Sequence, residues 1–406
     1  MALVYNRRMN ITHHASLFQE LELPCGITLK NRIAKAAMSD SLGDGRGNPT
    51  PSQIRLYERW AEGGVAVSIV GEVQGNPGFA EKPGNLVLTS DSDLRGFEML
   101  ARRGSVNGAQ VWLQLGHAGA MAHPPISHPK GPSALAIRGL SCGALPLEEV
   151  HALPSDFAQT AQLARELGFG GVQIHAAHGF LLSQFLSPLF NRRKDGYGGP
   201  IKNRMRLLLE VVAAVRSAVG PDFPVAIKLN ATDQLEGGLV EDEALTVIEA
   251  LDATGIDLID ISGGTYFPGA RSASDKVGAG PYFVEFAGRA RQRTRKPLMV
   301  TGGFKTLQQA KDAVAGGHAD VVGLARALAL DPSLPHNWQK NRMAEPTFPR
   351  FTDPPEGGIT AWYTMRLTAL GEDREPSGEA GLETAIRAYE NRDRQRIAAW
   401  NARFET

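Results

Sequence analysis

Short apolar runs of strand length alternate with amphipathic stretches of helical length along most of this chain. This alternation constrains the fold more than any other feature, because eight such runs are the number that closes a parallel (β/α)8 barrel. Several runs lack alternating polar residues, as expected of strands buried between a barrel interior and a helix layer. The expected strands are Ile33–Ala37, Val65–Val70, Gln110–Leu115, Gly171–His175, Val225–Leu229, Leu258–Ser262, Leu298–Thr301 and Val321–Leu324.

Helix start and stop signals agree with this α/β pattern. Pro154-Ser155-Asp156 is expected to open a helix that Gly168 ends, and Thr306 one that Gly316-Gly317 ends. An open, doubly wound sheet is the alternative architecture. It would need a G-x-G-x-x-G turn after the first strand, where residues 37–40 read Ala-Met-Ser-Asp. A single TIM barrel is therefore the predicted fold.

Composition limits the size and the partners. The 406 residues suit one barrel with an added tail, and 43 basic residues balance 43 acidic ones, which argues against a nucleic acid or an acidic membrane as partner. The two cysteines, Cys25 and Cys142, predict a reducing compartment rather than a disulfide framework. No run is long enough to span a bilayer, and residues 1–8 lack an apolar signal core. We expect a cytoplasmic protein that acts on a small molecule without a metal.

Segments outside the repeating units are expected to close the barrel and to shape its open end. Residues 17–29 predict a hairpin at the amino-terminal end of the barrel. Insertions at about 123–154 and 265–281 are rich in Pro, Gly and Ser and follow strands, where barrel enzymes place their substrate loops. We divide the chain into a barrel, residues 1–356, and an extension, residues 357–406, whose helical stretch Thr384–Phe404 packs on the barrel or forms a homo-oligomer contact.

Two histidines mark the end of the fourth predicted strand. His175 closes an apolar run, His178 follows three residues later, and glycine-rich polar sequence continues to Gly199. Two imidazoles where a buried strand emerges can direct hydrogen bonds to one substrate atom. The alternative is a pair satisfied within a strand-end network.

Glycines and cations end the later strands. Barrels commonly bind phosphate where the seventh and eighth strands end, because glycine lets the backbone approach an anion there; the alternative is tight turns alone. Lys228 shares a strand face with Asn230 and needs an anionic partner if it is buried, so a structural salt bridge is its alternative role. The candidate phosphate-binding residues are Gly302, Gly303, Phe304, Gly323, Ala325 and Arg326.

These motifs, in this order, resemble those of the Old Yellow Enzyme family of FMN-dependent oxidoreductases, in particular its NADH:flavin oxidoreductases and NADH oxidases. The resemblance runs from about Leu17 to about Arg366. Besides the histidine segment, its landmarks are the stretches 30–39 (KNRIAKAAMS), 114–119 (QLGHAG), 227–230 (IKLN), 262–264 (SGG), 300–304 (VTGGF) and 323–326 (GLAR).

The resemblance implies an FMN site and a role for each matching residue. Arg326 would bind the phosphate, Lys228 would face the flavin N1 and C2 carbonyl region, and Gln114 would face its O2/N3 edge. The strand-1 segment and the end of strand 2 would line the ring, with the Ser39 side chain near O4. These lining residues are Ala36, Ala37, Met38, Ser39, Gly71 and Glu72.

The resemblance also implies the chemistry, with one departure. In the family, NADH or NADPH reduces the flavin, hydride then passes to an activated alkene, and the pair matching His175 and His178 binds the substrate oxygen. A tyrosine usually protonates the product at the position of Phe180, which has no such proton. Water, or one of Tyr197, Tyr266 and Ser183, would then be the acid. Two alternatives stay open, namely oxidation of an amine or other donor, as a dehydrogenase, demethylase or NADH oxidase, and a flavin-independent lyase, isomerase or binding module.

Overall fold

The computed structural model describes residues 15–405, apart from 138, 268–279, 343–344 and 375–380, so most of the predicted insertion at 265–281 lies outside the described residues. Eight parallel strands form a closed barrel in which the last pairs with the first. All eight predicted strands are present, with ends within four residues of those expected. The strands are β3 Ile33–Met38, β4 Val67–Gln74, β6 Gln110–Gly116, β10 Gly171–Ala176, β11 Val225–Asn230, β12 Leu258–Ser262, β13 Leu298–Thr301 and β14 Val321–Leu324.

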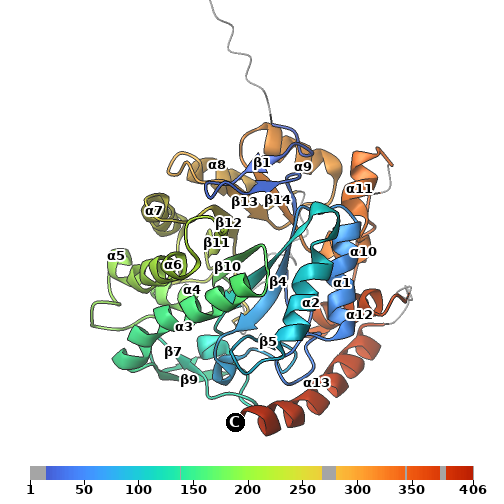
Figure 1. Ribbon diagram of the computed structural model, residues 1–406. Coiled ribbons are helices and arrows are strands. Elements are labelled where there is room, and N and C mark those ends of the chain that lie inside the picture. Colours follow the sequence, from blue (N-terminus) through green and yellow to red (C-terminus); the bar gives the residue numbers. More distant parts are fainter. Residues whose placement is uncertain (1–14, 138, 268–279, 343–344, 375–380, 406) are drawn as a thin grey trace, which may run out of the picture.

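Helices surround the barrel (Figure 1). The predicted helix after Thr306 is confirmed, because the Thr306 side chain accepts a hydrogen bond from the backbone of Gln309 and the Gln309 side chain returns one, which makes a capping box. Gly316 caps the other end of this helix. The helices are α1 Pro51–Glu62, α2 Leu94–Gly104, α3 Leu147–Glu166, α4 Leu181–Leu186, α5 Ile201–Arg204, α6 Arg206–Val219, α7 Glu241–Asp252, α8 Val284–Ala290, α9 Leu307–Ala315, α10 Arg326–Leu330 and α11 Leu334–Gln339.

The predicted start of the third helix is wrong. Helix α3 begins at Leu147, and Pro154 lies inside it instead of opening it. Val150 and Leu153, in the turns before Pro154, are buried in the main core. The free energy gained by their burial offsets the loss of the backbone hydrogen bond that Pro154 cannot donate.

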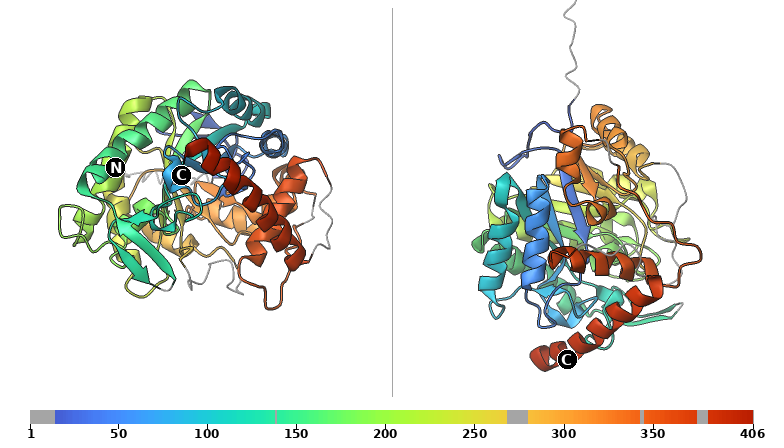
Figure 2. Two further views of the ribbon diagram at one scale, coloured as in Figure 1. Left: turned by 90° about the horizontal axis from the view of Figure 1, so that it is seen from below. Right: turned by 90° about the vertical axis from the view of Figure 1, so that its right-hand side faces the viewer.

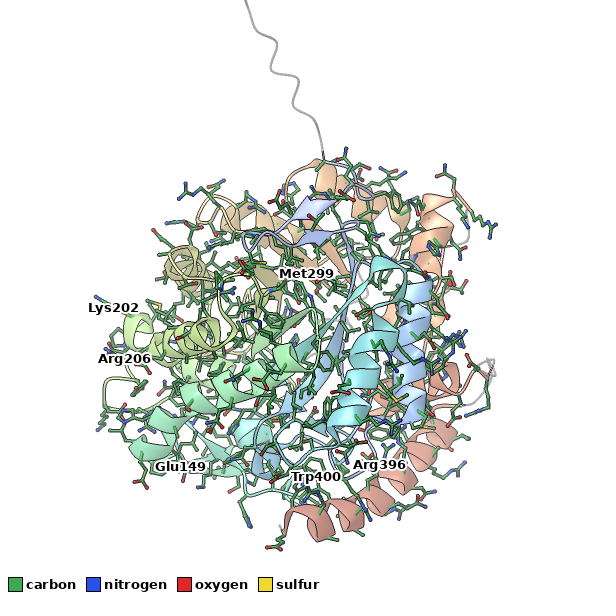
Figure 3. The ribbon with its side chains drawn as sticks, in the orientation of Figure 1. Glu149, Lys202, Arg206, Met299, Arg396 and Trp400 are labelled. Carbon is green, nitrogen blue, oxygen red and sulfur yellow. The ribbon has the colours of Figure 1, made fainter. Side chains whose placement is uncertain are left out.

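The amino-terminal hairpin closes one end of the barrel, as predicted. Its strands, β1 Leu21–Glu22 and β2 Thr28–Leu29, pair antiparallel. Leu23 and Leu29 pack against the interior cluster that includes Trp112 and Met299, and Met299 is labelled inside the barrel in Figure 3. The hairpin lies at the top of Figure 1, so access to the interior is left to the carboxyl end of the strands.

Short strands surround the carboxyl end of the barrel, and the second barrel strand contains a bulge. The register of β4 shifts against β6 between Val70 and Val73, after which β4 also pairs with β5, Leu86–Val87. The insertion predicted at 123–154 carries a small separate sheet and the start of α3. Its strands are β7 Lys130–Gly131, β8 Leu135–Ile137 and β9 Leu140–Ala144.

Two helices form the end of the chain. Helix α12, Gly358–Gly371, packs against α1, and the predicted helix near the carboxyl terminus is present as α13, Leu382–Phe404. Helix α13 crosses the carboxyl end of the barrel beside the first strands (Figures 1 and 2). Helix α13 therefore packs on its own barrel. The division of the chain into a barrel and an extension at residue 356 stays a prediction. Over the part of the chain that the structure describes, we find no helix with the length and apolarity needed to cross a membrane.

Buried contacts hold α13 in place. Trp400 is fully buried in a cluster with Ala80, Val87 and Ile126, and Arg396 donates to the backbone oxygen of Ser41 at 2.6 Å. Figure 3 shows Arg396 and Trp400 on this helix. The helix thus contacts the loops that follow β3, β4 and β6.

Candidate active site

His178 adopts a backbone conformation that few residues other than glycine adopt. Its φ is 61°, a left-handed value whose strain costs about 1–3 kcal/mol. Its N–H donates to the side-chain oxygen of Asn230 at 3.1 Å, and its carbonyl accepts from the backbone of Tyr266 at 3.0 Å. Strand β11 and the segment that follows β12 thereby fix the second histidine where β10 ends.

The two predicted histidines meet, and they belong to a longer path of polar side chains. His175 Nε2 lies 3.1 Å from His178 Nδ1, and His178 Nε2 lies 2.9 Å from the hydroxyl of Ser262. On the other side, His175 Nδ1 lies 2.8 Å from Glu72 Oε1, an ion-pair distance without hydrogen-bond angles. All four ring nitrogens therefore face polar atoms within this path.

Burial decides the charge of the second histidine. Desolvation lowers the pKa of His178 well below its ordinary value, and the neighbouring His175 and Lys228 lower it further. His178 is therefore neutral at pH 7 and carries one N–H. Which ring nitrogen holds that hydrogen depends on its neighbours.

The bulge in β4 brings the side chain of Glu72 to the histidines. Glu72 has a φ of 57° and is 4% exposed. A side chain on Gly71 would lie 2.3 Å from the Met38 carbonyl oxygen, and one on Gly116 would lie 2.5 Å from Glu72 Oε2. Burial, with the charge of Glu72, raises the pKa of the neighbouring Glu81 to about 7. The sequence predicted only the main chain of Glu72 here, because it does not reveal the bulge.

Aromatic rings surround the pair. Phe180 is 2% exposed, and its ring centroid lies 4.7 Å from that of His175. The ring of Tyr266 lies 5.5 Å from that of His178 and 6.1 Å from that of Phe180. Of the phenols considered as acids, Tyr266 is thus at the site.

The structure does not place Tyr197 with the histidine pair, so its predicted catalytic role needs correction. Its hydroxyl donates to Glu210 on α6 at 2.9 Å, and its ring contacts His151 on α3 and Phe185 on α4. Tyr197 therefore joins the helix layer. Ser183, another candidate acid, is buried in α4, where its hydroxyl accepts from the backbone of Gly179.

A buried polar network links the strands beneath this site. Lys228 donates to Asp260 Oδ2 at 2.6 Å, and both side chains are at most 1% exposed. Asp260 also accepts from Gln173 and from Thr301, while Gln114 donates to Gln173 at 2.7 Å. The salt-bridge interpretation of Lys228 is therefore what the geometry shows, and its charge is compensated before any cofactor binds.

The ends of β13 and β14 have the backbone that close approach to an anion requires. Gly302 and Gly303 have φ values of 123° and 83°. A side chain on Gly323 would lie 2.1 Å from the hydroxyl of Thr301. Arg326 stands over the ring of Tyr363 at 5.5 Å, and among the described residues no carboxylate forms an ion pair with it. A glycine-lined strand end beside an unpaired guanidinium fits a phosphate group.

The remaining predicted cofactor residues lie around the same opening. Ala36 is fully buried, whereas Ala37 and Met38 are half-buried. The hydroxyl of Ser39 is buried and has no hydrogen-bond partner in the described structure, as expected of a group that awaits a ligand. Phe304 is buried and Ala325 precedes α10. Together with Arg326, these positions fit FMN.

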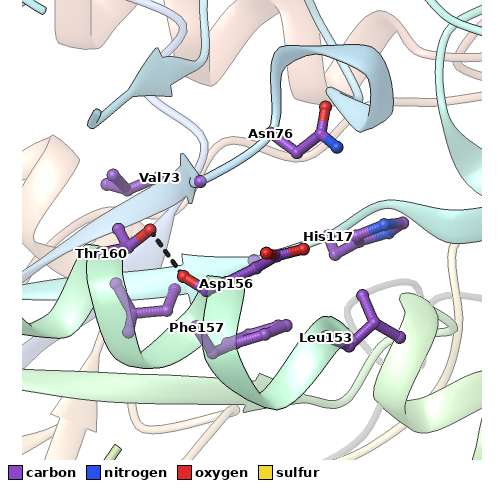
Figure 4. Close-up of a pocket in the computed structure, with 10 residues that line it drawn as sticks. Val73, Asn76, His117, Leu153, Asp156, Phe157 and Thr160 are labelled. Carbon is purple, nitrogen blue, oxygen red and sulfur yellow. Dashed lines mark hydrogen bonds between the residues drawn. The ribbon is translucent and has the colours of Figure 1, made fainter. Parts of the chain in front are cut away.

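A small cavity between β4, β6 and α3 is a packing feature (Figure 4). Its volume of about 10 Å³ has room for one water molecule. His117 lines it, accepts a hydrogen bond from the backbone of Gly119 and stacks on Phe79. Burial lowers the pKa of His117 to about 3, so this histidine is neutral.

Comparison with known proteins agrees with this geometry. Residues 16–345 match the model of the NADH:flavin oxidoreductase / NADH oxidase family. The chain is 33% identical to the NADH-dependent flavin oxidoreductase iliE of Neonectria sp., over 86% of the chain and 50% of that longer protein. It is 32% identical to the iliE protein of Hypocrea jecorina, over 79% of the chain and 88% of the relative.

A solved structure shows the same architecture. Morphinone reductase superposes with a TM-score of 0.70 at 25% identity, covering 84% of this chain and 92% of the other. The family match spans the barrel strands and the histidine, glycine and arginine positions described above. The chain therefore belongs to the Old Yellow Enzyme family of NADH:flavin oxidoreductases.

Proposed function

We propose that this protein is an FMN-dependent ene-reductase that uses NADH or NADPH to reduce an alkene conjugated with a carbonyl or nitro group. The observation that carries the proposal is the contact of His175, which is buried, with His178 at the carboxyl end of β10, where the two rings approach to 3.1 Å. Such a pair can hold a substrate oxygen that becomes negative during the reaction. When bound, FMN would supply the transfer of hydride from the nicotinamide to the alkene carbon.

The residues around the opening support FMN as the flavin. Arg326 and the glycines that end β13 and β14 would hold the phosphate, and the unpaired hydroxyl of Ser39 would face the ring. Gln114 and Lys228 lie in the polar network beneath. Because Asp260 already compensates Lys228, any effect of this cation on the flavin would be smaller than that of a bare charge.

The histidines would act by hydrogen bonding. A substrate oxygen would replace one of the contacts within the pair or the contact with Ser262. A preorganised donor to a developing oxyanion contributes ~3 kcal/mol. The strained backbone of His178, fixed by Asn230, keeps its ring in place before substrate arrives.

One observation favours a second candidate function, the oxidation of a C–H bond next to nitrogen or oxygen. Phe180 is packed against His175 and has no proton to give. A reaction that removes hydride from a saturated carbon would not need that proton.

Stopped-flow kinetics separate the two functions. We expect the NADH-reduced protein to be re-oxidised by enones and nitroalkenes faster than by oxygen. His175→Ala and His178→Ala should each slow this step by ~10²–10³-fold, the effect of losing an oxyanion donor. His128→Ala removes an exposed imidazole and is the matched control. Re-oxidation by oxygen alone, together with reduction of the oxidised protein by an amine, would contradict the ene-reductase and support the second function.

A further inference from the structure

A buried lysine lies on the outer face of the barrel, behind the segments that are expected to line the flavin. The residues on either side of Lys35 in β3 belong to the interior cluster, so its own side chain points to the helix layer. Its ammonium group stands over the rings of Trp60 and Tyr57 on α1, 4.5 and 5.1 Å from their centroids. It donates to the carbonyl oxygen of Ile69 at 3.2 Å and to the Tyr57 hydroxyl at 3.4 Å. Lys35 is fully buried, and burial lowers its pKa to about 7. Because a buried amine is costly without hydrogen bonds, these contacts decide where it can lie.

The carbonyl that Lys35 contacts belongs to the irregular part of β4. The register of β3 against β4 shifts after Lys35, and the register of β4 against β6 shifts after Val70. Gly71 and Glu72, whose backbone is expected beside the flavin, lie in this stretch. A bulge interrupts the regular ladder, so its backbone depends on other contacts for its position. The hydrogen bond from Lys35 to Ile69 is such a contact, made from outside the barrel.

The Tyr57 hydroxyl connects the same lysine to the end of β3. It donates to Asp40 Oδ2 at 3.0 Å, and the other oxygen of this carboxylate accepts from the side chain of Gln53 on α1 at 2.9 Å. Asp40 follows Ser39, whose unpaired hydroxyl is expected near the ring. Burial and Asp40 raise the pKa of Tyr57 well above its ordinary value, while a hydrogen bond from the backbone of Gly71 lowers it. The hydroxyl therefore contacts both segments that are expected to line the ring.

Trp60 fixes the lysine from the other side. Its indole N–H donates to the carbonyl oxygen of Leu328 on α10 at 3.0 Å, and its side chain is fully buried. We infer that Lys35, Tyr57 and Trp60 form an outer clamp that positions the end of β3 and the bulge of β4 for the flavin ring. Lys35 is thus a positioning residue, because it acts through backbone that it holds. The inference rests on the FMN site proposed above.

Flavin titrations of the flavin-depleted protein test the outer clamp by binding. Lys35→Met removes both hydrogen bonds of the amine, and Tyr57→Phe removes only the hydroxyl. Each variant should weaken FMN and riboflavin by the same factor, because both ligands carry the ring. We expect ~10-fold, the effect of losing one hydrogen bond to a charged group. Unchanged affinities, or a loss confined to FMN, would overturn the inference.

A second lysine provides the matched control. Lys296 also donates to a backbone carbonyl, that of Thr254 at 2.8 Å, but it precedes β13 at the amino-terminal end of the barrel. Lys296→Met should leave both affinities unchanged. A loss in this variant equal to that in Lys35→Met would overturn the inference, because the effect would then not depend on the position of the lysine.

Hydrogen–deuterium exchange tests the position of the bulge whether or not flavin is bound. The amides of residues 70–74 should exchange faster in Lys35→Met and in Tyr57→Phe than in the parent protein, while those of β12 keep their rate. Equal exchange at 70–74, or an equal increase in β12 from a general loss of stability, would overturn the outer clamp. If Lys35→Met does not fold, Tyr57→Phe decides both measurements. A parent protein that binds no flavin refutes the proposed FMN site, whereas the exchange result still decides the clamp.

Discussion

The buried ion pair beneath the active site allows a prediction with a defined magnitude. Lys228 and Asp260 are 2.6 Å apart and almost fully buried. In Lys228→Met, the Asp260 carboxylate keeps the donors Gln173 and Thr301 but loses its cation. Breaking a buried pair in this way costs about 3–5 kcal/mol, because the remaining charge lacks both its partner and water.

A double-mutant cycle isolates the interaction of the pair. Asp260→Asn leaves the ammonium group unpaired and should cost a similar amount. The double variant buries no uncompensated charge, so it should recover at least ~2 kcal/mol relative to the sum of the single variants. Denaturant unfolding followed by circular dichroism, with flavin removed and again with saturating FMN, measures all four proteins. If the losses in unfolding free energy of the two single variants sum to that of the double variant within ~0.5 kcal/mol, the pair does not interact as the structure indicates.

The same variant separates a structural role of Lys228 from an electronic one. If its charge reaches the flavin, Lys228→Met lowers the reduction potential of the bound flavin and slows reduction by NADH. Because Asp260 compensates this charge, we expect the effect on stability to be the larger of the two. An unchanged potential in a folded, FMN-loaded variant would leave Lys228 with the structural role alone.

Three further predictions follow from the site and its surroundings. Phe180→Tyr should speed re-oxidation by cyclohexenone if the site reduces alkenes, and no gain on any enone would count against that function. Arg326→Ala should weaken binding of FMN more than of riboflavin in fluorescence titrations, because only FMN carries the phosphate; equal losses would remove the phosphate role. The depressed pKa of His117, about 3 against an ordinary 6.5, means that the unfolded chain binds its proton first as pH falls. His117 should therefore contribute ~1.4 kcal/mol per pH unit to the fall in stability between about pH 6 and 4, and His117→Gln should make acid unfolding curves shallower by that amount.

The sequence predicted the barrel well, because barrel strands are buried on both faces and therefore consist of recognisable apolar runs. Helix α9 was also predicted at both ends, since Thr306 and Gly316 are local signals. The start of α3 was predicted incorrectly. The helix begins before Pro154 and continues through it, because the residues before the proline, such as Val150, are buried against the barrel. A local signal was thus overridden by a distant contact.

The candidate site was predicted in its parts but not in its connections. The spacing of His175 and His178 indicated a pair, yet nothing in the spacing shows that Glu72 turns toward it through a bulge with a left-handed backbone. Ser262 was one landmark among several, and its contact with His178 depends on strands 84 residues apart in the chain. Tyr197 shows the converse, because its closeness in sequence to the histidines does not bring it near them in space.

Helix α13 lies beyond residue 345, where the family match ends, and it holds three loops at the rim of the barrel. Gly45 approaches Arg396 and Gly47 approaches Phe404 so closely that added side-chain carbons would lie 2.9 Å and 3.2 Å from them. Changes in loop length are the usual way in which a barrel acquires new substrates, because surface loops tolerate them. Here the loops after β3, β4 and β6 contact α13, so insertions that displace this helix would cost the burial of Trp400. The evolvable part of this rim is therefore the side formed by the loops that follow β10 to β14.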